Sequence, residues 1–206
     1  MRAILIALAA ALVTFAMPAM AQDAQWSLCL NGYGEFEREA QIDACDTIIA
    51  SEEFEGVRLA IAYASRARAR SELGDFRRAV VDYREAVRLA PGNPSLLNGL
   101  CWNMALANDN LDEARTICDE SLRIRPNDDN TLDSRGMVGL KQGRFQEAWA
   151  DYDAAFQRNG IAPFLYGRGI AAKRLGRTAE GDADIAAALE MDPGIAETYA
   201  RRGMTP

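Results

Sequence analysis

Residues 61–91 read IAYASRARARSELGDFRRAVVDYREAVRLAP, and a pattern of fixed spacing within this stretch returns three more times along the chain. The pattern is a small residue, a core residue, a second small residue and, in three of the four copies, a Pro. Its four copies are Ala79-Tyr83-Ala86-Pro91, Ala114-Cys118-Ser121-Pro126, Ala148-Tyr152-Ala155-Gly160 and Gly181-Ile185-Ala188-Pro193. Successive copies begin 35, 34 and 33 residues apart. A period near 34 residues indicates helical repeats that bury their apolar faces only by stacking on one another.

Each repeat is expected to be an antiparallel helix hairpin. In the first copy, 61–73 and 77–89 are predicted to be helices, separated by a turn at Gly74-Asp75 and ended by Pro91-Gly92. In the third hairpin Asn110 takes the place of the turn glycine, because Asn is the next most tolerant of left-handed backbone. The fold class is therefore predicted to be all-α, a right-handed superhelical solenoid of five hairpins and a C-terminal capping helix.

The chain divides into four parts. We expect a cleaved signal peptide at 1–21, a degenerate helical hairpin at 22–56, the repeat array at 57–195, and a capping helix with a short tail at 196–206. The terminal units of a solenoid depart from the repeat pattern because one of their faces meets water instead of a neighbour.

The N-terminal segment has the order of features that defines an export signal. Arg2 precedes an apolar run at 3–15, and Ala19-Met20-Ala21 forms an A-x-A cleavage site. The alternative, a membrane anchor, needs about 20 apolar residues, more than this run supplies. No later segment is apolar enough to span a bilayer, so no transmembrane segment is expected after cleavage. Loss of Arg2 changes the formal charge from −7 to −8, and this acidity argues against nucleic acid as a partner.

The repeats resemble those of the tetratricopeptide repeat family. Leu73-Gly74-Asp75-Phe76, together with the first copy of the pattern, is close to a full family signature. The segments Leu100-Cys101-Trp102 and Leu122-Arg123-Ile124-Arg125-Pro126 resemble exported members from Gram-negative bacteria, which implies a periplasmic location. The resemblance implies binding of a protein or peptide in a concave groove lined by the first helix of each hairpin. It implies no catalytic activity.

The candidate groove residues follow from that resemblance. The predicted partner groove includes Tyr63, Asn103, Met137, Tyr166, Lys173 and Arg174. The best-known peptide-binding members clamp a C-terminal carboxylate with paired Lys and Asn residues, and this pattern is missing from the candidate positions here. Lys173 and Arg174 form a basic spot that could favour an acidic tail, or they are an ordinary solvated helix end.

Charged pairs recur between the helices of the hairpins. Arg66 and Asp82, Arg135 and Asp151, and Arg168 and Asp184 are each 16 residues apart. We expect each pair to form a charge-assisted contact; the alternative is that the Arg stems pack while the guanidinium groups reach solvent.

Cysteines take these positions in two other hairpins. Cys101 stands at the Arg position of its hairpin, Cys118 follows the Asp position, and Cys29 and Cys45 occupy nearly matching places in the first hairpin. In an exported chain, an even number of cysteines without a Cys-x-x-Cys motif favours structural disulfides over free thiols or a metal site. We therefore predict Cys29–Cys45 and Cys101–Cys118 disulfides.

The sequence contains none of the common catalytic signatures. With 0 His, a Ser–His or Cys–His nucleophile and histidine metal ligands are excluded. Asp128-Asp129-Asn130 resembles part of a calcium loop but lacks its Gly and distal Glu, so a helix cap is the expected role. We therefore expect no enzyme activity, cofactor or metal. The predicted function is a non-catalytic adaptor or assembly factor of the cell envelope. The alternatives are a self-associating structural solenoid and an accessory subunit of an envelope enzyme.

Overall fold

The computed structural model describes residues 19–31, 34 and 36–206, and this part of the chain forms eleven α-helices and no strand. The helices are α1 Ala19–Leu30, α2 Arg38–Ala50, α3 Gly56–Glu72, α4 Phe76–Leu89, α5 Pro94–Ala107, α6 Leu111–Ile124, α7 Asp129–Gln142, α8 Phe145–Arg158, α9 Ala162–Arg174, α10 Thr178–Met191 and α11 Ile195–Arg201. They pair as five successive hairpins followed by a single helix, as predicted. Most of the predicted signal peptide, residues 1–18, lies outside the described residues.

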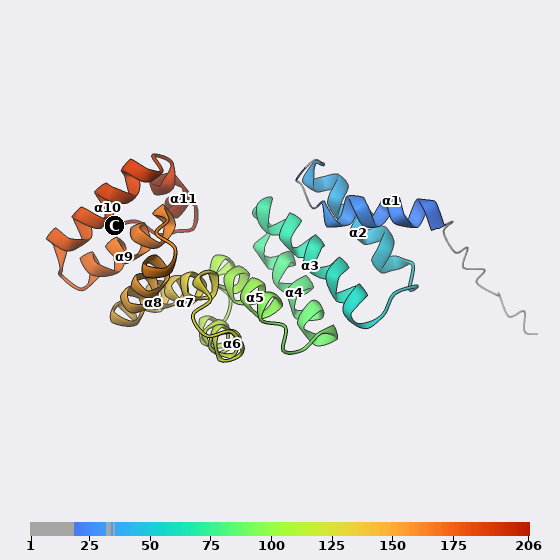
Figure 1. The fold of residues 1–206 in the computed structure, drawn as a ribbon, viewed down its shortest axis with the longest axis horizontal. Helices are drawn as coiled ribbons and strands as arrows, with labels where there is room; N and C mark the ends of the chain where they lie inside the picture. The colour runs from blue at the N-terminus through green and yellow to red at the C-terminus, as the bar shows by residue number, and fades with distance from the viewer. Residues whose placement is uncertain (1–18, 32–33, 35) are drawn as a thin grey trace, which may run out of the picture.

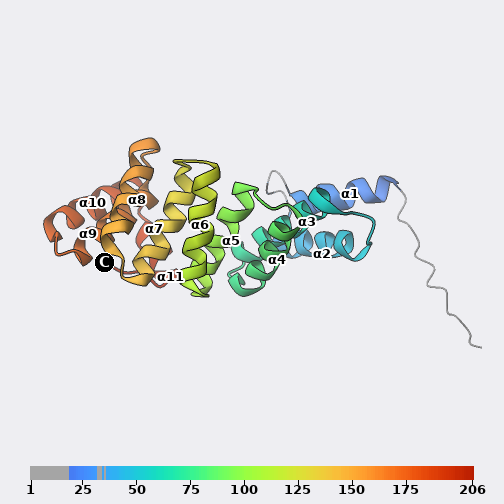
Figure 2. The ribbon, with the colours of Figure 1, turned by 90° about the horizontal axis from the view of Figure 1, so that it is seen from below.

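The hairpins stack in chain order along the long axis of the molecule and form an arc (Figures 1 and 2). Each first helix contacts the first helix of the next hairpin, from α1 through α3, α5 and α7 to α9. Each second helix packs on the first helices on either side of it, whereas neighbouring second helices are linked only by long side chains such as the Arg84–Glu113 and Arg115–Glu147 pairs among the described residues. Because the first helices are closer together, they form the inner, concave layer. α11 packs on α9 and α10 at the inner side of the arc.

Two local features differ from the sequence-based expectation. α1 begins at Ala19, ahead of the hairpin expected at 22–56, so it extends into the predicted cleavage site. The turn of the third hairpin contains two left-handed Asn residues, Asn108 with φ 52° and Asn110 with φ 36°. Asn110 also caps α6 by accepting a hydrogen bond from the Glu113 backbone N–H at 3.4 Å. The turn therefore contains a second left-handed residue, Asn108, which the sequence comparison of the repeats did not identify.

Tyrosines on second helices fill the space left by glycines on first helices. Tyr152 on α8 is fully buried, and a Cβ atom added at Gly136 on α7 would lie 2.8 Å from its ring. A Cβ atom at Gly167 on α9 would overlap the same ring, and one at Gly99 on α5 would overlap Tyr83 of α4. These glycines let successive helices approach closely enough to bury the aromatic core residues of the repeat pattern.

The three predicted Arg–Asp pairs are present as bidentate ion pairs. Each Arg donates through Nε and Nη2 to both oxygens of its Asp, at 3.0 and 2.6 Å for Arg66–Asp82, 2.9 and 2.6 Å for Arg135–Asp151, and 2.8 and 2.8 Å for Arg168–Asp184. The aspartates are largely buried, with side-chain exposures of 1%, 8% and 12%. The alternative of guanidinium groups directed to solvent is therefore wrong.

Each of these arginines also binds a second aspartate, on the preceding hairpin. Arg66 donates to Asp46 of α2 at 2.5 Å, Arg135 to Asp119 of α6 at 2.7 Å, and Arg168 to Asp153 of α8 at 2.5 Å. One guanidinium thus joins three helices and two hairpins. Burial opposes the charge of Arg135, but its hydrogen bonds to the two carboxylates outweigh burial and raise its pKa.

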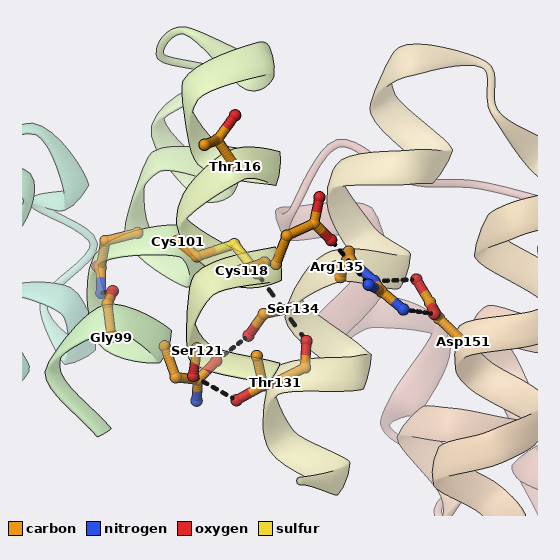
Figure 3. Close-up of a disulfide and its surroundings, with 12 residues drawn as sticks. Gly99, Cys101, Thr116, Cys118, Ser121, Thr131, Ser134, Arg135 and Asp151 are labelled. Carbon is orange, nitrogen blue, oxygen red and sulfur yellow. Dashed lines mark hydrogen bonds and ion pairs between the residues drawn. A yellow bond between two sulfur atoms is a disulfide. The ribbon is translucent and has the colours of Figure 1, made fainter. Parts of the chain in front are cut away.

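The third and first hairpins carry disulfides in place of these pairs. The structure contains Cys101–Cys118 and Cys29–Cys45, with Cα–Cα distances of 5.6 and 4.8 Å. Figure 3 shows the Cys101–Cys118 bridge between α5 and α6, on the side away from the Arg135–Asp151 pair. Both bridges are buried and link the two helices of one hairpin, as the sequence predicted. In the chain-entropy model, closing a loop of this length stabilises the fold by about 3 kcal/mol.

Candidate binding groove

Two adjoining pockets lie along α3 and α5. The first, of 230 Å³, is lined mainly by apolar and small residues of α3, among them Val57, Ile61 and Ala64. The second, of 430 Å³, lies between α3, α5 and α7 and is mostly polar. Both pockets include Arg68 and Tyr83, so they form one continuous groove along the first helices.

Two of the predicted groove residues belong to this half of the molecule. Tyr63 is a half-buried residue of α3 that lines neither pocket, and the Arg66 guanidinium lies 5.3 Å from its ring centre. Asn103 lines the second pocket and is only 2% exposed. Its Nδ2 donates to the Gly99 carbonyl at 2.8 Å, while its Oδ1 has no hydrogen-bond partner within the described chain.

Met137 and Tyr166 are not at an open surface, contrary to expectation. Met137 is 0% exposed and Tyr166 3%, and both belong to the main hydrophobic core. Tyr166 packs on Tyr199 of α11 with ring centres 4.9 Å apart, and the Tyr199 hydroxyl donates to the Pro163 carbonyl at 2.7 Å. The capping helix therefore covers the part of the concave layer that the sequence assigned to a partner.

Lys173 and Arg174 are engaged within the chain. Lys173 pairs with Asp182 at 2.7 Å, and Arg174 donates to the Thr205 carbonyl at 3.2 Å. Arg174 also lines a separate 520 Å³ pocket that includes Met204 and Thr205 of the tail. The two basic groups thus hold neighbouring parts of the chain in place.

A glycine turns the tail back onto the solenoid. After α11, Gly203 adopts φ 77°, and the Met204 N–H donates to the Tyr199 carbonyl at 2.9 Å. The Gly203 N–H donates to the Ala200 carbonyl at 2.9 Å, which completes a Schellman motif. Met204 packs against the core, so the tail is fixed on the inner side of the last hairpins.

The end of α11 reaches the edge of the groove through Arg202, which lines an adjoining 640 Å³ pocket together with Trp102. Its guanidinium lies 4.8 Å from the ring centre of Trp102 on α5 and 5.3 Å from that of Tyr199. Asp133 of α7 faces it from the second pocket. Burial raises the pKa of Asp133 to about 7, although the Arg202 charge lowers it and Asp129 adds to the rise. The Asp133 carboxyl has no hydrogen-bond partner for its Oδ1 among the described residues.

Sequence reasoning missed Trp102 as a member of the groove and Arg202 as its neighbour. Trp102 departs from the small residues Ala67, Gly136 and Gly169 at matching positions of the other repeats, and this departure was the available signal. Nothing in the spacing placed Arg202, which lies 100 residues further along the chain, against that ring.

The described residues hold no further feature that points to other chemistry. No group of three or more potential metal ligands was found among them. Asp128 caps α7, accepting a hydrogen bond from the Thr131 N–H at 3.0 Å, as expected for the calcium-like segment. None of the helices described here is long and apolar enough to cross a bilayer.

Comparison with known proteins identifies one sequence repeat and the fold. A sequence model of the tetratricopeptide repeat matches residues 60–93. The structure is similar to a thermophilic tetratricopeptide repeat protein of Thermus thermophilus, with a TM-score of 0.66 at 17% identity over 88% of this chain and 97% of that one. It is also similar to MamA from Desulfovibrio magneticus RS-1, with a TM-score of 0.69 at 12% identity over 87% and 98% of the two chains.

A third similar structure is a tetratricopeptide repeat protein from Parabacteroides merdae. Its TM-score is 0.66 at 14% identity over 90% of this chain and 75% of that one. No curated protein sequence matches this chain. The chain thus contains a tetratricopeptide repeat at residues 60–93, and the similar structures show that it has the helical-repeat fold of such proteins.

Proposed function

We propose that this protein is a non-catalytic adaptor or assembly factor of the bacterial cell envelope, which holds a peptide or partner helix in its concave groove. The observation that carries the proposal is the continuous groove along α3 and α5, with pockets of 230 and 430 Å³. Val57 and Ile61 at its edge are 62% and 42% exposed. Exposed apolar side chains beside a polar pocket are suited to an amphipathic segment of another protein.

Two features support a periplasmic location. The signal-like segment at 1–21 directs export, and the two buried disulfides are typical of proteins that fold in an oxidising compartment. The formal charge of −7 disfavours binding to the phosphate backbone of nucleic acids and leaves proteins as the expected partners.

Site-specific photocrosslinking in cells would test the proposal. A photoreactive amino acid is placed at Ile61 in the groove and, as a matched control, at Val81, an apolar residue of α4 that is 65% exposed and lines neither groove pocket. The captured species are then identified by mass spectrometry. We expect a discrete partner from Ile61 and none from Val81.

A blocking variant makes the assignment specific to the groove. Ala64 lines the first pocket, so Ala64→Arg should fill it and abolish capture from Ile61, whereas Val81→Arg should leave capture unchanged. Capture of the same partner from Val81 alone would refute binding in the groove. Capture of only a second copy of the chain would instead establish the self-associating solenoid.

A further inference from the structure

Two buried oxygen atoms at the centre of the groove lack the donors that buried acceptors require. They are Oδ1 of Asn103 and Oδ1 of Asp133, and neither has a hydrogen-bond partner within the described chain. Asn103 is 2% exposed and is oriented by its bond to the Gly99 carbonyl, which leaves Oδ1 free to accept. Both residues line the same 430 Å³ pocket. A buried acceptor without a donor costs free energy, and a ligand that supplies donors recovers it.

The free acceptors of the pocket favour a ligand that donates hydrogen bonds. The charged residues that line the pocket are Arg68, Glu72 and Asp133. Arg68 already donates to the Leu30 carbonyl at 2.8 Å, on the N-terminal hairpin. Glu72 pairs with Arg38, so the acceptors of the pocket that no donor of the described chain meets are the Oδ1 atoms of Asn103 and Asp133. A carboxylate ligand would meet repulsion from Asp133, so an acidic peptide is not the expected occupant.

Trp102 forms one wall of the pocket and already binds a guanidinium group of the chain itself. The Arg202 guanidinium lies 4.8 Å from the Trp102 ring centre, within the range of a cation–π interaction. Yet its Nη1 is buried without a hydrogen-bond partner in the part of the chain that the structure describes. Arg202 lines an adjoining 640 Å³ pocket that shares Trp102 with this one, and it does not satisfy the oxygens of Asn103 and Asp133.

We propose that Trp102, Asn103 and Asp133 form a recognition pocket for an arginine side chain of a partner peptide, and that Arg202 is a built-in competitor which the partner displaces. The proposal rests on the proposed function of the groove and names the chemistry that it recognises. Arginine suits the pocket better than lysine because its planar guanidinium stacks on an aromatic ring while its five N–H groups reach several acceptors. Displacement exchanges an occupant without these hydrogen bonds for one that forms them.

The test uses the full chain and two synthetic peptides, acetyl-Gly-Arg-Gly-amide and its citrulline analogue. Citrulline has nearly the same shape but no charge. Binding is followed by the NMR signal of the Trp102 indole N–H, assigned with Trp102→Phe. We expect saturable binding of the arginine peptide, and an affinity about tenfold higher in Arg202→Ala, because the internal competitor is removed. Arg201→Ala is the matched control, since Arg201 pairs with Glu197 and is exposed, and it should leave the affinity unchanged.

The outcomes separate this inference from the proposed function. In the Arg202→Ala background, Asp133→Asn should weaken arginine binding at least about tenfold. Equal binding of the two peptides, or no saturable change at Trp102 in either protein, would overturn the arginine pocket. In that case a partner captured from Ile61 would still support the groove as the binding site. Conversely, arginine binding at Trp102 together with capture only from Val81 would support the arginine pocket and refute partner binding in the groove.

Discussion

The interlocking contacts of Arg135 give a quantitative prediction, because one guanidinium binds a buried and an exposed carboxylate. The Asp151 side chain is 8% exposed and accepts two hydrogen bonds, at 2.9 and 2.6 Å, whereas the Asp119 side chain is 50% exposed and accepts one at 2.7 Å. Asp151→Asn keeps the size of the side chain but turns an amide N–H₂ toward the guanidinium. Losing a buried partner costs about 3–5 kcal/mol. Since Arg135 keeps Asp119, we expect a loss of about 2–3 kcal/mol in the free energy of unfolding.

Asp119→Asn serves as the matched control on the same arginine. Exposed ion pairs contribute about 0–1 kcal/mol, so this variant should lose less than about 1 kcal/mol. The measurement is urea denaturation of the oxidised proteins followed by helical circular dichroism, with the slope of the transition compared between variants. Equal losses in the two variants, or a loss below about 1 kcal/mol for Asp151→Asn, would refute the view that the buried half of the contact carries the stabilisation.

Three further perturbations test other parts of the structure. Replacing Cys101 and Cys118 by Ser should lower the free energy of unfolding by about 3 kcal/mol, and non-reducing peptide mapping of the unaltered chain should recover these two cysteines linked to each other; a link from either to the first hairpin would contradict the pairing. Gly167→Ala forces a methyl group into the Tyr152 ring, so it should lower the free energy of unfolding, measured by urea denaturation, by about 1–3 kcal/mol. In Gly160→Ala the new Cβ would lie 3.6 Å from its nearest neighbour, so this control should change stability by less than about 1 kcal/mol. Burial raises the pKa of Asp133 from 3.8 to about 7, so between these values the folded state binds more protons than the unfolded state and stability falls as pH rises. Asp133→Asn should remove that decline, worth roughly 2–4 kcal/mol, and an unchanged pH profile would contradict it.

The repeat pattern carried enough information to predict most of the architecture. Small residues such as Ala79 and Gly181, and the prolines that follow most copies, recur because every hairpin must solve the same packing problem. The Arg–Asp spacing of 16 residues likewise predicted the buried pairs, since both partners lie in one hairpin. The second carboxylate on each arginine was missed, because Asp119 and Asp153 belong to the preceding hairpin and spacing within a repeat does not reveal them.

The groove was predicted less well, because its content depends on contacts between distant segments. Met137 and Tyr166 occupy first-helix positions that would face a partner in an open solenoid. Whether they do depends on α11, whose seven residues carry no repeat signature. Once the Schellman turn at Gly203 fixes the tail, Tyr199 covers Tyr166 and Arg202 reaches Trp102. The free part of the concave layer is consequently the half along α3 and α5.

The interface between the second and third hairpins differs from the other hairpin interfaces, and it borders the free half of the concave layer. Because Cys101 replaces the arginine of α5, no guanidinium is present there to bind carboxylates of two hairpins at once. Arg84 of α4 instead pairs with Glu113 of α6, and both side chains are at least a third exposed. Exposed pairs stabilise little, so this joint is held mainly by the packing of Tyr83 on Gly99. The disulfide meanwhile keeps the two helices of the third hairpin together. Adjustment of the groove to a ligand is therefore expected to occur between α4 and α5, beside both pockets, and not within the hairpin that carries the arginine pocket.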